Sequence, residues 1–79
     1  MLSAYTLGAD RLYLLTELVI GDKSFEELLN VFPNPSSLTR TMRHYEHLRF
    51  VTRKPELKEG SPVYSITQKG RRIEKLSRA

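Results

Sequence analysis

The sequence predicts a single α+β domain that is mostly helical. Three segments within the first 48 residues have the spacing of amphipathic helices, and two later β-prone runs flank a loop with two prolines and a glycine. A further helix-prone segment closes the chain. Seventy-nine residues are too few for two hydrophobic cores, so we expect an arm of residues 1–9 followed by one domain of residues 10–79.

The first helix is predicted from Asp10 to Ile20. Asp10 can cap its start, and Gly21 can supply the left-handed residue that ends it. Apolar side chains cover most of its circumference, and they comprise Leu12, Tyr13, Leu14, Leu15, Leu18 and Val19. Such a helix needs more than one neighbour, so we expect the arm around Tyr5 and Leu7 or a second subunit to pack against it.

The second helix has a recognisable start and end. Ser24 followed by Glu27 is the pair of a capping box, in which each side chain accepts a hydrogen bond from the other residue's backbone. One helical face then carries Phe25, Leu28, Leu29 and Phe32. Asn34 stands between two prolines and is pushed out of the helical region, so the helix must end at Phe32 or Pro33.

A third helix is expected to be capped by Ser36 or Ser37 and to run to about Leu48. Its buried stripe consists of Leu38, Met42, Tyr45 and Leu48. A rotation of about 100° per residue puts a polar and largely cationic set of side chains on the opposite side. This outward set comprises Ser36, Thr39, Arg40, Arg43, His44 and His47.

The remaining segments predict a two-stranded hairpin and a last helix. The runs 50–54 and 63–67 alternate with a period of two, and residues 55–62 suit an exposed loop between them. Thr67 can cap the last helix, in which Ile73 and Leu76 are expected to point inward and Gly70 to permit close packing. Tyr45 and Tyr64 are expected to serve in packing rather than in base stacking.

The charges are distributed unevenly along the chain. Residues 1–35 hold two basic and five acidic side chains, a balance of −3, whereas residues 36–79 hold eleven basic and four acidic side chains, a balance of +7. This asymmetry indicates an anionic partner, with nucleic acid the first candidate and an anionic membrane the second. An uneven surface that serves only solvation is the alternative.

Two helices joined by a short turn and followed by a hairpin form the arrangement of a winged helix-turn-helix. In that arrangement the second helix of the pair enters the DNA major groove, which is wide enough to admit a helix with its side chains. Arg40 and Arg43 lie one turn apart on the exposed side, so one can reach a base edge while the other meets a base or phosphate. Ser36, Ser37 and the backbone at the helix start can hold a phosphate.

Three stretches of the sequence also resemble a family. They are "SFEEL", "LTRTMRHYEHLRFVTR" and "VYSITQKGRRIEKL", and from about Leu12 to Leu76 the chain is similar to winged-helix regulators of the MarR and HxlR type. The resemblance implies a DNA-binding regulator, usually dimeric, with residues of about 37–48 in the major groove and a 53–62 wing on the adjacent backbone or minor groove. By position it assigns DNA contacts to Ser37, Thr39, Arg40, Arg43 and His44, and wing positions to Arg53, Lys54 and Lys58.

The chain departs from that pattern in three places. Arg49 stands where relatives usually have a glycine that ends the helix, and a left-handed arginine there costs up to about 1 kcal/mol relative to glycine. The turn before the third helix is about two residues shorter than in the HxlR pattern. Relatives also dimerise through longer terminal helices, so we expect a homodimer here to use other residues. The candidates are Tyr5, Leu7, Tyr13, Leu14 and Leu18.

Several classes of function are excluded. The chain has no cysteine, no glycine-rich phosphate loop and no nucleophile–base pair, so we expect no enzyme. His44 and His47 point about 60° apart and lack a third ligand, so we expect no metal site. We expect no cofactor, and a core this small leaves little room for a small-molecule ligand. No apolar run can cross a bilayer and no signal peptide is recognisable, so we expect a soluble protein with no membrane partner.

The predicted function is therefore sequence-preferring binding of double-stranded DNA by a homodimeric transcription regulator in the cytoplasm, at the nucleoid. The competing interpretation is a winged-helix module for protein–protein interaction, whose basic face binds an acidic partner. Salt dependence separates the two, because DNA binding through several phosphates weakens steeply as salt rises.

Overall fold

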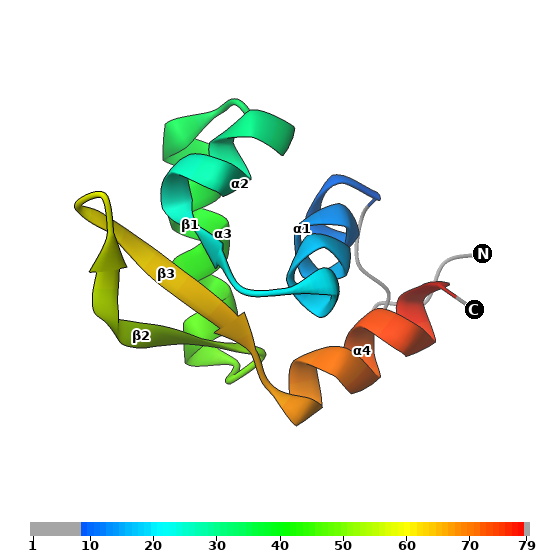
Figure 1. Cartoon of the computed structure of the whole chain (residues 1–79). Helices are drawn as coiled ribbons and strands as arrows, with labels where there is room; N and C mark the ends of the chain where they lie inside the picture. The colour runs from blue at the N-terminus through cyan, green and yellow to red at the C-terminus, as the bar shows by residue number, and fades with distance from the viewer. Residues whose placement is uncertain (1–8, 79) are drawn as a thin grey trace.

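A computed structural model of the chain describes residues 9–78, which form four helices and one small sheet (Figure 1). In chain order the elements are α1 (Ala9–Ile20), β1 (Lys23–Ser24), α2 (Phe25–Val31), α3 (Pro35–His47), β2 (Val51–Lys58), β3 (Ser61–Ile66) and α4 (Gln68–Arg78). This order confirms the prediction of an α+β winged helix-turn-helix domain. Residues 1–8, with Tyr5 and Leu7, lie outside the described residues.

One hydrophobic core holds these elements together. The hairpin of β2 and β3, called the wing from here on, stands on one side of α3, and α4 lies beside α1 on the other (Figure 1). The buried apolar side chains are Leu14, Leu15, Leu18, Leu28, Leu38, Met42, Tyr45, Phe50, Val51, Tyr64 and Ile66. Tyr45 and Tyr64 are 1% and 5% exposed, so their prediction as packing residues is confirmed.

Helix α1 corrects part of the predicted dimer surface. Leu14 and Leu18 are 0% and 1% exposed, because the sheet, α2 and α4 pack around α1 within one chain. Both are core residues and cannot serve as contacts with a second subunit. Tyr13 is 48% exposed and Ile20 is 74% exposed, so the outer side of this helix does carry apolar surface.

Helix α2 has the predicted start and end. The Ser24 hydroxyl accepts a hydrogen bond from the Glu27 N–H at 3.2 Å, and Glu27 Oε1 accepts one from the Ser24 N–H at 2.9 Å. This reciprocal pair is the predicted capping box. Phe32 is the C-cap, as the prolines on either side of Asn34 require.

The sheet has one more strand and a tighter turn than the sequence predicts. Its order is β1-β3-β2, all antiparallel, so the predicted two-stranded hairpin forms as β2 and β3, and β1 adds a third strand that the sequence analysis did not expect. Strand β1 has only two residues, which is too short for any alternating pattern. The strands also extend through the predicted loop of residues 55–62 to a two-residue turn at Glu59 and Gly60, with φ of 53° and 81°. A register shift between Arg53 and Leu57 accommodates Pro55, which has no N–H to donate to a partner strand.

Helix α4 begins as predicted but buries a different side chain. Thr67 caps it by accepting the Gly70 N–H at 3.0 Å. A Cβ at Gly70 would overlap the backbone carbonyl oxygen of Phe50, so the expected close packing at this glycine is confirmed. Leu76 was expected inside but is 62% exposed, whereas Glu74 is 2% exposed.

The buried Glu74 carboxylate joins α4 to α1. Its Oε2 accepts a hydrogen bond from the Thr16 hydroxyl at 2.9 Å and pairs with Arg78 Nε at 2.7 Å. These partners satisfy a charge that would be costly to bury alone. Leu76 therefore points outward because the inward side of α4 is used by this polar contact and by Ile73, which packs against the core.

Candidate nucleic-acid interface

Helix α3 is capped two residues before Ser36, the first of the two serines expected to cap it. Asn34 is its cap, with Oδ1 accepting the Ser37 N–H at 3.1 Å, and Pro35 is the first helical residue. The predicted cap at Ser36 or Ser37 is therefore wrong. Asparagine followed by proline is itself a helix-start signal, because proline at the first position loses no hydrogen bond. Pro35 has no N–H and that of Ser37 is taken, so the helix start offers a phosphate fewer backbone donors than expected.

The outward side of α3 is exposed and cationic, as predicted. The exposed side chains are Ser36, Thr39, Arg40, Arg43, His44 and His47, while Ser37 is half-buried. The opposite side buries Leu38, Thr41, Met42 and Tyr45. None of the cationic or imidazole side chains on the outward side has an ion-pair partner within residues 9–78. They are therefore available to an external anion.

The helix ends at Arg49 in the left-handed conformation that a glycine would normally supply. Arg49 has a φ of 64°. Its N–H bonds to the Glu46 carbonyl at 3.0 Å, and the Phe50 N–H bonds to the Tyr45 carbonyl at 2.9 Å. The aromatic rings of Tyr45 and Phe50 pack with centroids 5.9 Å apart. This pair of bonds with its hydrophobic contact is a Schellman motif, so the arginine changes the residue type but not the way α3 ends.

The base of the wing is tied to α3. Arg53 Nε lies 3.3 Å from Glu46 Oε1, and its guanidinium lies 6.0 Å from the centre of the Tyr64 ring. The hydrogen bond and charge of Glu46 raise the pKa of Arg53. Burial raises the pKa of Tyr64, so its hydroxyl stays protonated.

The two wing lysines are also paired with carboxylates. Lys54 Nζ lies 2.9 Å from Asp22 Oδ2 and 3.6 Å from Glu56 Oε1, and Lys58 Nζ lies 3.1 Å from Glu27 Oε2. The hydrogen bond to Asp22 raises the pKa of Lys54, and the same bond lowers the pKa of Asp22. The Ser24 N–H and then Lys58 lower the pKa of Glu27. All three predicted wing cations thus already have acidic partners.

Sequence reasoning missed these acidic partners of the predicted wing cations. Lys54 and Asp22 are 32 residues apart, and Lys58 and Glu27 are 31 residues apart. They meet because β1, which directly precedes α2, pairs with β3 and so brings the start of α2 beside the wing. The only sequence signal was the excess of acid in residues 1–35. It did not specify which cations would be neutralised.

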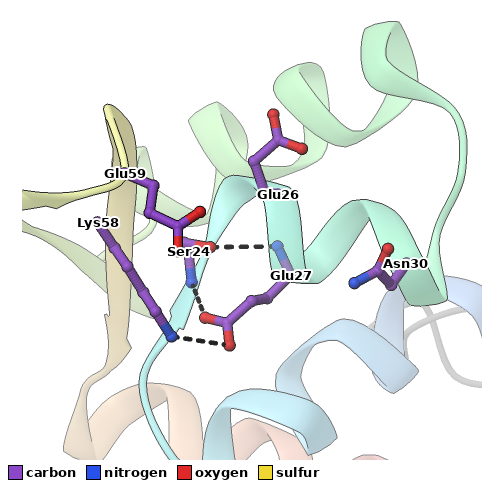
Figure 2. Close-up of a pocket in the computed structure, with 6 residues that line it drawn as sticks. All are labelled: Ser24, Glu26, Glu27, Asn30, Lys58 and Glu59. Atoms are coloured by element: carbon purple, nitrogen blue, oxygen red, sulfur yellow. Dashed lines mark hydrogen bonds and ion pairs between the residues drawn. The ribbon is translucent and has the colours of Figure 1, made fainter.

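A polar hollow lies where the tip of the wing meets α2. Its lining residues are Ser24, Glu26, Glu27, Asn30, Lys58 and Glu59, and the Glu27 carboxylate bridges Ser24 and Lys58 within it (Figure 2). Three glutamates and one lysine thus line the hollow, and among them Glu27 is the one paired with Lys58. Over the described part of the chain, no three His, Asp or Glu side chains are grouped so that they could hold a metal ion. No helix among residues 9–78 is both long and apolar enough to cross a membrane.

The chain was compared with known proteins at the level of sequence family and of structure. A family model described as HxlR-like helix-turn-helix matches residues 10–78. A mutant of MarR from E. coli, complexed with operator DNA, superimposes with a TM-score of 0.76 and 19% identity over 90% of this chain and 53% of MarR. A DNA complex of a ZitR mutant from Lactococcus lactis gives 0.75 and 13%, over 92% of this chain and 51% of ZitR.

The transcriptional regulator YodB from B. subtilis, in its reduced form, superimposes with a TM-score of 0.74 and 19% identity, over 87% of this chain and 71% of YodB. The search of curated proteins gave no match. The chain spans about half the length of the MarR and ZitR chains. At these identities the structural similarity concerns the fold.

Proposed function

The chain belongs to the HxlR-like helix-turn-helix family, and from this premise we propose that it is a transcription regulator that binds double-stranded DNA with sequence preference. Neither this family nor the neighbouring structures are enzymes, which agrees with the sequence-based expectation. MarR and ZitR have been solved with DNA, and they share the fold of this chain. Binding to chromosomal DNA would locate the protein at the nucleoid.

The observation that carries the proposal is the exposed cationic side of α3. Arg40 and Arg43 are exposed one helical turn apart, and neither has an acidic partner among residues 9–78. An unpaired arginine gives up no existing ion pair when it binds, so its fork of donors can meet guanine O6 and N7 or a phosphate. Thr39, His44 and His47 flank the two arginines and can add contacts to bases or backbone.

The wing contributes in a different way from α3 in this proposal. Strand β2 is separated from β1 by β3, and it carries Arg53, Lys54 and Lys58. If α3 entered the major groove, β2 would run beside the DNA backbone. Each of these three cations is paired with a carboxylate in the free protein. Phosphate contacts by the wing therefore compete with existing ion pairs, whereas those by α3 do not.

We also propose that the protein acts as a homodimer. Tyr13 and Ile20 on α1, together with Leu76 on the neighbouring α4, are large apolar side chains that are 48%, 74% and 62% exposed. A second copy would cover them, and two-fold symmetry would then require a roughly palindromic site with half-sites about one helical turn apart. A mass measurement of the free protein over a range of concentrations tests the dimer separately from DNA binding.

Selection of bound sequences from a random duplex pool tests the DNA-binding proposal. Enrichment of a common motif is expected, followed by salt-dependent binding to that motif. The Arg40→Ala, Arg43→Ala double variant provides the residue-level test. If it bound the selected motif as tightly as the wild type, α3 would not be the binding helix. Enrichment of no sequence and no duplex binding would instead favour the module that binds an acidic protein.

A further inference from the structure

The tip of the wing is held against α2 by one carboxylate. Glu27 Oε1 accepts the Ser24 N–H at 2.9 Å as part of the capping box, while Oε2 lies 3.1 Å from Lys58 Nζ (Figure 2). The two oxygens thus have separate partners. Because the capping hydrogen bond already fixes the Glu27 side chain, pairing with Lys58 orders little further on the glutamate side.

The charges around this contact oppose a phosphate at the same place. Glu26, Glu27 and Glu59 line the hollow with Lys58, so the side chains of the hollow include three acidic groups and one basic group. The hydrogen bonds of Glu27 hold its pKa below the ordinary value, which keeps this carboxylate ionised at neutral pH. While the pair is closed, the side chains that line the hollow carry a net negative charge, which disfavours a DNA phosphate at this place.

The Lys58 ammonium has three donors, but a phosphate that contacts it beside Glu27 also meets the negative charge of that carboxylate. If Lys58 moves away from Glu27 to avoid this repulsion, the phosphate contact is made at the expense of the ion pair, and Glu27 is then solvated beside the approaching DNA. The pair is exposed, with 56% of the Lys58 side chain and 38% of the Glu27 side chain accessible, so the exchange needs no unfolding. The arginines of α3 face no such competition.

We infer that Glu27 competes with DNA phosphate for Lys58 and thereby holds the wing tip back from the duplex, so that the affinity is lower than the number of cations implies. This inference rests on the proposed function, and it names α2 as the element that restrains the wing. It predicts that removing the charge of Glu27 tightens DNA binding.

Glu27→Gln removes that charge and keeps the helix start. Glutamine is accepted at this position of a capping box, so its amide oxygen can still take the Ser24 N–H. Its amide nitrogen replaces the oxygen that pairs with Lys58 and cannot accept a hydrogen bond from it. Loss of the competing ion pair is therefore expected to raise the duplex affinity of Glu27→Gln by about two- to five-fold at moderate salt, which matches the typical strength of a surface ion pair.

Glu26→Gln is the matched control. Glu26 is an exposed neighbour in the same helical turn and hollow, and it has no ion-pair partner in the described part of the chain. Its replacement makes the same change in net charge, so it measures the general effect of removing one negative charge near DNA. Circular dichroism of both variants verifies that the helix content is unchanged.

A double-mutant cycle with Lys58→Ala isolates the competition. The advantage of Glu27→Gln over Glu26→Gln is expected with Lys58 present and is expected to vanish in the Lys58→Ala background. Equal affinities of the two glutamine variants would overturn the inference. Weaker binding by Glu27→Gln would also overturn it, because Glu27 would then hold the wing in its binding orientation.

The same titrations separate this inference from the proposed function. If the wild type binds no duplex, the DNA-binding proposal fails and the competition fails with it. If the wild type binds a selected duplex and Glu27→Gln gives no gain beyond the control, only the competition fails. Wild-type binding with a gain that depends on Lys58 supports both.

Discussion

Replacing Arg49 by glycine is expected to stabilise the protein. Arg49 has a φ of 64° at the end of α3, and a residue with a Cβ is disfavoured in this left-handed region by about 1–2 kcal/mol. Glycine avoids that penalty but loses more conformational freedom on folding, which costs about 0.5–1 kcal/mol. The expected net gain in the free energy of unfolding is therefore about 0.5–1 kcal/mol. For a domain of this size it corresponds to a rise in melting temperature of about 2–8 °C.

Thermal unfolding followed by circular dichroism measures this gain. Arg43→Gly is the matched control, because it removes the same charge from another exposed position of α3, but one with helical backbone. Glycine inside a helix costs about 1 kcal/mol, so the control is expected to be destabilised while Arg49→Gly is stabilised. A lower melting temperature for Arg49→Gly than for the wild type would refute the reasoning. It would mean that contacts of the arginine side chain outweigh the backbone strain.

Three further outcomes are expected. Gly70→Ala is expected to lower the free energy of unfolding by about 1–3 kcal/mol in urea denaturation, since the added methyl overlaps backbone and no side-chain rotation can relieve it; an unchanged midpoint would contradict this. Arg40→Ala and Arg43→Ala are each expected to weaken binding to a selected duplex by about 1–3 kcal/mol and to relax sequence preference, as measured by competition between selected and scrambled duplexes. Asp22 and Glu27 have folded-state pKa values below their ordinary values of 3.8 and 4.5, so the stability from their pairs is complete above these values and is lost as pH falls below them. NMR titration of the wing amides between pH 6 and pH 2 reports this loss. Glu27→Gln is expected to remove the pH-dependent shift of the amides near Lys58.

The elements predicted best were those whose signals are local in the sequence. The capping box of Ser24 and Glu27 lies within four residues, and it gave the start of α2 correctly. The start of α3 was misplaced because three serine or asparagine candidates compete there, and the proline at position 35 decides for Asn34. Strand β1 was missed because its two residues form a strand only through pairing with Val63 and Tyr64, which are far away in the sequence.

The candidate site divides in the same way. Which residues of α3 face outward follows from helical periodicity once the buried stripe is recognised, and the structure exposes the predicted residues with Ser37 only partly so. Burial of Glu74 in place of Leu76 did not follow, because an acidic residue is assigned to the surface unless its partner Thr16, on α1, is known to face it. The ion pairs of Lys54 and Lys58 in the wing were missed for the same reason, because their acidic partners are distant in sequence.

The uneven charge of the chain takes on a more specific meaning once these pairs are considered. From the sequence, the balance of +7 over residues 36–79 indicates an anionic partner. In the folded chain, Asp22 pairs with Lys54 and Glu27 pairs with Lys58. Arg40 and Arg43 have no ion-pair partner among the described residues. The acidic half of the chain therefore lowers the positive potential of the wing and leaves that of α3 unchanged by ion pairing. In the proposed complex, contacts of α3 with bases would therefore gain weight relative to contacts of the wing with phosphate, which is expected to favour discrimination between sequences over affinity for DNA in general.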